Sequence, residues 1–365
     1  MRLTDFMRKI HDTPTLGVIV LTGGGTEAIG ELLRHGNGSN TLLEAVVPYS
    51  TAALDDFLHG KPEKYCSESC ARQLAMAAFQ RATVLAGGGI PVFGLSATCS
   101  LVKKGERVGR QHRAFIGLQT ANKTISQALE LARSRSREEE EHVVAESILN
   151  MTAEACGLQD RLDTADDPNE RREYLGTNQE FSLICGIVKS IHLPFRGECQ
   201  DFIIFPGSFN PVHDGHRAVI KHATALTGKP VVAEISVKNV DKPMLDYREI
   251  HERCDSLRQE DCFIGVYLTS APTFPEKADL FPNRTFLIGF DTLVRIADPR
   301  YYGGEEARNK ALKHLADRGT KFLAYRRKGT TFEDLPPLLR EITVMPGDFQ
   351  PVDVSSTQIR KSQPA

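Results

Sequence analysis

The fold of the C-terminal half is decided by residues 202–216, FIIFPGSFNPVHDGH. The stretch opens on a short apolar run, which is typical of a strand buried on both faces. A glycine turn follows, and two histidines three positions apart then stand where a helix begins. Open parallel sheets bind ligands beyond the carboxyl ends of their strands, so this turn is the predicted place of a nucleotide.

The residue types in this turn favour phosphate chemistry. Gly207 lets the backbone come close to a phosphate, and a helix start near Asp214 offers unpaired N–H groups and the positive end of a dipole. His213 and His216 point to one side of the first turn, where two imidazoles can stabilise a phosphoryl group during its transfer. Such a transfer needs no protein nucleophile. The alternative interpretation is a pair of surface histidines at a loop.

A second element stands at the far end of the chain, in residues 352–360, VDVSSTQIR. Hydroxyl groups, backbone N–H groups and one arginine at a new helix start can hold the β- and γ-phosphates of a nucleotide. Without a ligand, the same hydroxyls would be an ordinary helix N-cap.

Strand and helix patterns alternate across the C-terminal half. Apolar runs predict strands at 231–237, 285–289 and 321–325, and helical patterns cover 247–258 and about 305–317. This alternation predicts a parallel sheet with helices on both faces.

The N-terminal half also reads as an α/β domain. A buried strand over Leu16–Leu21 ends in a glycine-rich turn, and helices are predicted over 67–86 and about 124–149. Residues 157–181 are polar without a clear period. The sequence therefore predicts a domain over 1–156, a connecting segment over 157–200 and a second domain over 201–365.

Composition narrows the choice of partners. The chain has 365 residues, a formal charge of −2 and eight cysteines without a C-x-x-C pair. Neither nucleic acid nor a membrane is expected as a partner, since no global basic charge and no long apolar stretch is present. The scattered thiols and the absence of a signal-peptide pattern at the N-terminus indicate a cytoplasmic or nuclear setting.

The C-terminal motifs together resemble the nucleotidylyltransferase superfamily, and within it the nicotinamide/nicotinate mononucleotide adenylyltransferases. Residues 207–216 resemble the opening motif, 287–293 (LIGFDTL) the internal G-x-D segment, 325–329 (YRRKG) the late R-x-G, and 355–360 the S-S-T-x-I-R motif. The resemblance implies a Rossmann-like fold and the transfer of AMP from ATP to NMN or NaMN, with release of pyrophosphate and Mg²⁺ accompanying ATP. No protein metal ligands are implied.

The resemblance also implies site residues. Its catalytic set is His213, His216 and Arg360. Its ATP-binding set comprises the opening turn, the G-x-D segment and the terminal hydroxyls: Gly207, Ser208, Phe209, Asn210, Gly289, Asp291, Ser355, Ser356 and Thr357. Lys242 would meet the acceptor's phosphate. The family usually stacks the pyridine ring on an aromatic residue, often Trp; this chain has no Trp, so Tyr301 and Tyr302 are the candidates.

The N-terminal half resembles the C-terminal domain of competence-damage-inducible protein A, the nicotinamide-mononucleotide deamidase family, which implies an α/β sandwich. The resemblance rests on the Thr22-Gly23-Gly24 turn, the run that ends in Tyr49-Ser50, and the Cys66-Ser67-Glu68 start of an alanine-rich helix. Val20 stands where the family has its nucleophilic serine and Leu54 where it has its lysine. Neither side chain can attack an amide or take a proton, so a non-catalytic domain is predicted.

Several alternatives stay open at this stage. In the N-terminal domain Ser39, Ser50 or Ser67 could replace the missing nucleophile, the glycine turn could bind a nucleotide, or the domain could only make the protein a homo-oligomer. For the chain as a whole, the alternatives to an adenylyltransferase are a non-catalytic nucleotide-binding or regulatory protein and an NMN amidase.

Overall fold

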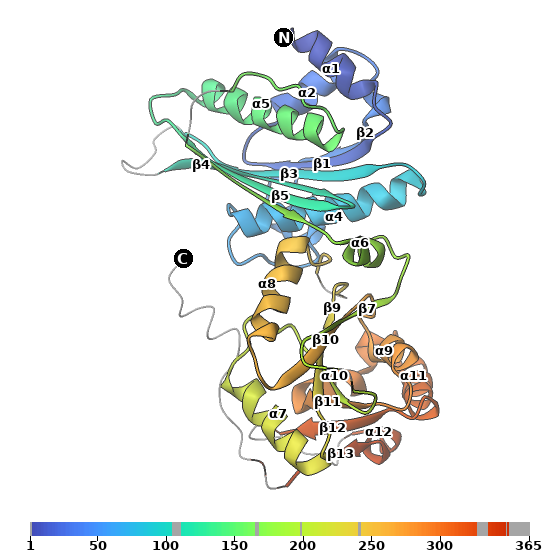
Figure 1. Cartoon of the computed structure of the whole chain (residues 1–365). Coiled ribbons are helices and arrows are strands. Elements are labelled where there is room, and N and C mark those ends of the chain that lie inside the picture. Colours follow the sequence, from blue (N-terminus) through green and yellow to red (C-terminus); the bar gives the residue numbers. More distant parts are fainter. Residues whose placement is uncertain are drawn as a thin grey trace. The chain divides into compact units, whose positions relative to one another are not determined.

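The computed structural model describes residues 2–103, 111–164, 168–197, 199–239, 242–326, 335–347 and 349 (Figure 1). The chain separates into two compact units. Unit 1 runs up to Phe181 and also takes in the segment that ends at Arg248, whereas unit 2 begins at Ser182 and resumes at Glu249. The prediction of a mixed α/β chain with two sheets is confirmed.

Among the described residues, unit 1 holds a sheet in the order β2-β1-β3-β4-β5-β6. β1 pairs in parallel with β2 and β3, and the other neighbours pair antiparallel. The strands are β1 Leu16–Thr22, β2 Leu42–Val46, β3 Val92–Ser100, β4 His112–Thr120, β5 Lys123–Leu131 and β6 Asn169–Leu175. The helices are α1 Leu3–His11, α2 Glu27–Arg34, α3 Thr51–Phe57, α4 Glu68–Ala86 and α5 Arg137–Ala155, with a 3-10 turn η1 at Gly38–Asn40.

β1 is apolar throughout because both faces of this sheet are covered. Successive side chains of a strand point to opposite faces. Val18 and Val20 belong to the cluster beneath α4, whereas Ile19 and Leu21 belong to the larger core with α1, α2 and α5. Figure 1 shows α4 on one side of the sheet and α1, α2 and α5 on the other. Unit 1 is therefore a three-layer α/β/α arrangement.

The alanine-rich face of α4 packs unusually close to its sheet. Ser67 caps the helix by accepting a hydrogen bond from the Cys70 N–H at 3.2 Å. A Cβ added to Gly94 in β3 would lie 2.1 Å from the Ala75 carbonyl oxygen of α4. Only glycine fits at that strand position, because helix backbone occupies the space that a side chain would need.

One predicted helix was wrong. Residues 124–149 contain nearly all of β5 and the first part of α5 rather than a single helix. Ile125, Leu129 and Leu131 share one face of β5 at the strand period of two and are buried in the core. α5 begins at a capping box, in which the Glu139 N–H donates to the Ser136 side chain and the Ser136 N–H to the Glu139 carboxylate.

The range 157–200, predicted as a connection, contributes a strand to each sheet. β6 pairs antiparallel with β5 in unit 1, and β7 (Ser190–Pro194) pairs antiparallel with β10 in unit 2. The helix α6 spans Asn178–Ile184. β6 is mostly exposed and polar, as an edge strand can be, which hides its strand character from a search for apolar runs.

Residues 242–248 follow β9 in the chain but belong to unit 1. Tyr247 is fully buried there, and its backbone N–H donates to the Thr124 hydroxyl at 3.1 Å. Asp246 and Arg72 form a buried ion pair within the same unit. A segment from the second half of the sequence is thus part of the core of unit 1.

Among the described residues, unit 2 holds a sheet in the order β13-β12-β11-β8-β9-β10-β7, parallel except for β7. Its further strands are β8 Ile203–Pro206, β9 Val231–Ser236, β10 Phe263–Thr269, β11 Thr285–Gly289, β12 Lys321–Tyr325 and β13 Thr343–Val344. Its helices are α7 Asp214–Thr227, α8 Tyr247–Arg258 (which begins in unit 1), α9 Phe274–Leu280, α10 Phe290–Ala297, α11 Glu305–Asp317 and α12 Pro337–Glu341, with a 3-10 turn η2 at Pro299–Tyr301.

The order of the strands positions the site of unit 2. From β8 the chain first builds outward through β9 and β10, and then returns to place β11, β12 and β13 on the other side. The order therefore reverses between β8 and β11, which is where open α/β sheets bind their ligands. In Figure 1, α7 lies on one side of this sheet and α9, α11 and α12 lie on the other.

Candidate functional site

The turn after β8 is shaped by a buried phenylalanine. Phe209 has a positive φ of 44° and is 1% exposed. Its ring packs edge-on against Phe205 and Phe263, with centroids 5.4 and 5.3 Å away. A Cβ on Gly207 would lie 2.8 Å from this ring. Gly207 is therefore required by the packing of Phe209, a reason additional to the phosphate approach that the sequence predicts.

The two histidines stand together at the start of α7. His213 is the N-cap residue, and its backbone N–H donates to Nδ1 of His216 at 3.2 Å. The two ring centroids are 3.8 Å apart, and the His216 ring also lies 5.3 Å from that of Phe209. Because Nδ1 of His216 accepts a hydrogen bond, the neutral ring carries its proton on Nε2. That nitrogen is consequently a hydrogen-bond donor.

A second helix begins beside this turn. Gly289 ends β11 and is the N-cap of α10, and Asp291 lies in the first turn of that helix. β11 pairs with β8 through Phe286 and Ile204, so the carboxyl ends of both strands lie at the same edge of the sheet. A Cβ on Gly289 would meet nothing within 4 Å. The structure thus brings the opening turn, the histidine pair, Gly289 and Asp291 to the point where the strand order reverses.

Charged side chains fix the beginning of α7. Arg217 donates to Asp214 at 2.7 Å and to both oxygens of Glu260 at 2.6 and 2.8 Å. Hydrogen bonds from Arg217 hold the pKa of the Glu260 carboxyl below its usual range. Asp214 lies between the two histidines in the sequence. Its carboxylate forms an ion pair with Arg217 on the surface of the helix.

A further residue of this edge was not predicted as part of the site. Tyr325 ends β12 at the register position of Gly289, and its hydroxyl lies 2.9 Å from Nδ1 of His222 in α7. In the sequence, Tyr325 stands out only as the first residue of the stretch that resembles the late R-x-G motif. The pairing of β11 with β12 is what shows that it lies at the same sheet edge as Gly289.

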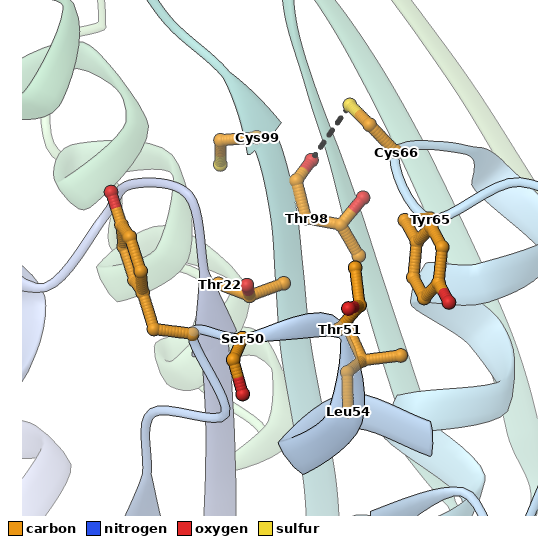
Figure 2. Close-up of a pocket in the computed structure, with 9 residues that line it drawn as sticks. Thr22, Ser50, Thr51, Leu54, Tyr65, Cys66, Thr98 and Cys99 are labelled. Carbon is orange, nitrogen blue, oxygen red and sulfur yellow. Dashed lines mark hydrogen bonds between the residues drawn. The ribbon is translucent and has the colours of Figure 1, made fainter.

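Unit 1 contains a pocket of about 320 Å³, a volume that includes space open to solvent (Figure 2). It lies at the ends of β1 and β3 and the beginning of α3, and its lining residues carry hydroxyl, thiol or apolar side chains: Thr22, Tyr49, Ser50, Thr51, Leu54, Tyr65, Cys66, Thr98 and Cys99. Leu54 thus faces a pocket at the position where the resemblance places a lysine, while Val20 is buried inside β1.

Two of the three alternative nucleophiles in unit 1, Ser50 and Ser67, cap helices. The Ser50 hydroxyl accepts from the Ala53 N–H at 3.2 Å and caps α3. The Ser67 hydroxyl caps α4 and donates to the Lys64 carbonyl at 2.8 Å. Burial raises the pKa of the Cys99 thiol well above its ordinary value and raises that of Cys70 to about 12. These two cysteines are thiols at neutral pH, whereas nucleophilic attack requires the thiolate.

Comparison with known proteins identifies the C-terminal half. Residues 204–362 match the cytidylyltransferase-like family. The chain is 27% identical over 151 residues to a Schizosaccharomyces pombe protein that is provisionally named a nicotinamide mononucleotide adenylyltransferase. This match covers 38% of the present chain and 59% of the yeast protein. The C-terminal half contains a cytidylyltransferase-like domain.

Solved structures resemble the N-terminal part of the chain. The competence/damage-inducible protein CihA of Agrobacterium tumefaciens is 15% identical, with a TM-score of 0.35, over 42% of this chain and 94% of that chain. A CinA-superfamily protein of Escherichia coli is 13% identical, with a TM-score of 0.33, over 42% of this chain and 90% of that chain.

The remaining predicted residues belong to other elements of the structure or lie outside the described residues. Tyr301 follows the far end of α10, is 48% exposed and carries the Arg295 guanidinium 5.1 Å from its ring centroid. Tyr302 is partly buried, and burial raises the pKa of its hydroxyl. Lys242 is exposed and belongs to unit 1. Four residues of the terminal motif lie outside the described residues: Ser355, Ser356, Thr357 and Arg360.

Among the described residues, no group of three or more His, Cys, Asp or Glu side chains is placed to hold a metal ion. None of the helices in the described ranges combines the length and the apolar character that a membrane span requires.

Proposed function

We propose that the cytidylyltransferase-like domain transfers the AMP part of ATP to the phosphate of a mononucleotide, NMN or NaMN, and releases pyrophosphate. A phosphate oxygen of the acceptor attacks the α-phosphorus of ATP. The bond from that phosphorus to the oxygen bridging to the β-phosphate breaks, and its electron pair leaves with pyrophosphate. The product is NAD or its nicotinate counterpart. Mg²⁺ enters as part of the MgATP substrate.

The observation that carries this proposal is the meeting of two helix starts at the reversal of strand order. The N-termini of α7 and α10 follow neighbouring strands of one sheet. Each offers backbone N–H groups and a positive dipole end, which suit a polyphosphate. The name given to the yeast relative supports the choice of acceptor.

Each site residue then has a proposed role. The turn from Gly207 to Asn210 would let the nucleotide approach the backbone, and Gly289 and Asp291 would lie on the adenosine side. His213 and His216 would contact the phosphates, with Nε2 of His216 donating to the charge that develops during transfer. Arg360 and the hydroxyls of Ser355, Ser356 and Thr357 are proposed to hold the β- and γ-phosphates.

The direct test is product formation by the purified full chain. With MgATP and either NMN or NaMN, we expect the dinucleotide and an equimolar amount of pyrophosphate. Omitting the acceptor should abolish pyrophosphate release, and replacing ATP by CTP tests the identity of the donor. Binding of ATP in calorimetry, without pyrophosphate from either acceptor, would instead establish the non-catalytic alternative.

The amidase alternative is tested separately, by ammonia release from NMN in the absence of ATP. We expect no release above the rate without protein, because the side chains of Val20 and Leu54 can neither attack nor take a proton. Ammonia formed in proportion to protein concentration would show that another residue of unit 1 had replaced the serine.

A further inference from the structure

Three aromatic rings from separate parts of unit 2 pack edge-on against one another. The Tyr325 ring, at the end of β12, lies 5.6 Å from the His222 ring of α7, and its hydroxyl is 2.9 Å from Nδ1 of His222. The ring of Phe349 lies 5.4 Å from that of His222 and 4.7 Å from that of Tyr325. The three interplanar angles are 86°, 72° and 87°, close to the T-shaped arrangement that aromatic pairs prefer.

Two of these rings form a pair that receives the third. Tyr325 is 4% exposed, and its hydrogen bond with His222 fixes the orientation of both rings. Phe349 is partly buried and follows the end of β13 by five residues. Its two ring contacts therefore attach the chain after β13 to the pair formed by His222 and Tyr325.

The elements that carry this pair also belong to the proposed phosphate site. Tyr325 is the register partner of Gly289, which ends β11 and is the N-cap of α10. His222 follows His216 by six positions on α7, which is a rise of about 9 Å along the helix. Phe349 is thus attached close to the histidine pair and on the same helix.

The length of chain after Phe349 matches this distance. Ser355 follows Phe349 by six residues and Arg360 by eleven. An extended chain covers about 3.5 Å per residue, so Ser355 can be no more than about 20 Å from Phe349. The terminal hydroxyls therefore stay within reach of the phosphates whenever Phe349 is in place. A short tether of this kind raises the effective concentration of the groups that it carries.

We propose that Phe349 is a positioning residue, which anchors the terminal motif to His222 and Tyr325 and so holds its hydroxyls and Arg360 at the β- and γ-phosphates. This role rests on the proposed function, in which the terminal motif binds those phosphates. The side chain of Phe349 has no group that binds phosphate, so it acts through the residues that follow it. Loss of the anchor should weaken nucleotides that carry β- and γ-phosphates and leave AMP unaffected.

The test is calorimetry of the full chain with MgATP and with AMP, in the absence of an acceptor. Phe349→Ala should weaken the binding of MgATP about tenfold and leave the binding of AMP unchanged, whereas Phe349→Tyr keeps the ring and should bind both as the unchanged chain does. The matched control is Val344→Ala, which removes a 59% exposed apolar side chain from β13 and should change neither affinity.

A double variant tests whether Phe349 acts through the terminal motif. If it does, adding Phe349→Ala to Arg360→Ala should weaken MgATP by no more than about twofold beyond Arg360→Ala alone, because both changes remove the same interaction. Two independent sites would instead give losses that multiply.

The possible results separate this role from the proposed function. The role is overturned if Phe349→Ala binds MgATP as well as the unchanged chain, if AMP and MgATP are weakened equally, if Phe349→Tyr is as weak as Phe349→Ala, or if the losses in the double variant multiply. Dinucleotide formation at full rate by Phe349→Ala would also overturn it and leave the proposed function standing. The expected binding pattern without pyrophosphate from NMN or NaMN would support the anchor and contradict the proposed function.

Discussion

Replacing His216 by alanine is expected to lower the rate of dinucleotide formation by about 10²–10³-fold, the usual effect of removing one hydrogen-bond donor from a transition state. The backbone N–H of His213 donates to Nδ1 of His216, which places the proton on Nε2. The ring of Phe209 packs against the His216 ring, and the two centroids are 5.3 Å apart. A donor fixed in this way needs little reorganisation when charge develops on the phosphoryl oxygens.

Thermal unfolding of the variant separates the loss of the hydrogen-bond donor from damage to the fold. His216→Ala also removes the acceptor of the His213 N–H, a capping interaction worth about 1 kcal/mol, so its thermal midpoint should fall only slightly. The matched control is His314→Ala in α11, which removes an exposed hydrogen bond with Asp279 and should keep full activity. A full rate in His216→Ala, with dinucleotide still formed, would remove His216 from the mechanism and leave the adenylyltransferase proposal standing.

The sequence predicted the elements of unit 2 well because they are encoded locally. Short apolar runs became β8, β9, β11 and β12, and the helix predicted over 247–258 is α8. Each strand is buried on both faces, so its central residues are apolar, with the exception of Glu234 in β9, whose carboxylate is paired with Lys277. The start of α7 at Asp214 followed from the same local pattern of strand, glycine turn and helix.

What the sequence could not show depends on partners distant along the chain. β5 was mistaken for helix because its apolar residues are few, and its strand conformation is established by pairing with β4 and β6. The inclusion of residues 242–248 in unit 1 follows from contacts such as Tyr247 with Thr124, more than a hundred positions away. The pocket around Thr98 likewise needs the parallel register of β1 and β3.

Replacing Lys277 by methionine is expected to lower the free energy of unfolding of unit 2 by about 3–5 kcal/mol, because it leaves a buried carboxylate without its cation. Lys277 and Glu234 are 5% and 1% exposed. The Lys277 ammonium donates to both oxygens of Glu234 at 2.7 Å, and the Thr269 hydroxyl donates to one of them at 2.5 Å. The backbone carbonyl of Glu234 accepts the Gly207 N–H at 3.0 Å, so this network is joined to the turn after β8.

An exposed pair in the same unit provides the comparison. Lys229 and Asp201 are 2.8 Å apart with side chains 41% and 66% exposed, so Lys229→Met should cost no more than about 1 kcal/mol. Unfolding of a chain with two compact units need not be a single transition, so hydrogen exchange of peptides covering β9 and β10 is the appropriate measurement.

The double variant Glu234→Gln, Lys277→Met decides whether the unpaired charge causes the loss. A neutral amide keeps an acceptor for the Thr269 hydroxyl, so stability should recover by more than half of what Lys277→Met removes. If instead the single variant costs no more than Lys229→Met, water must reach Glu234 in unit 2. If the double variant is as unstable as the single one, the loss comes from the packing of the lysine stem rather than from its charge.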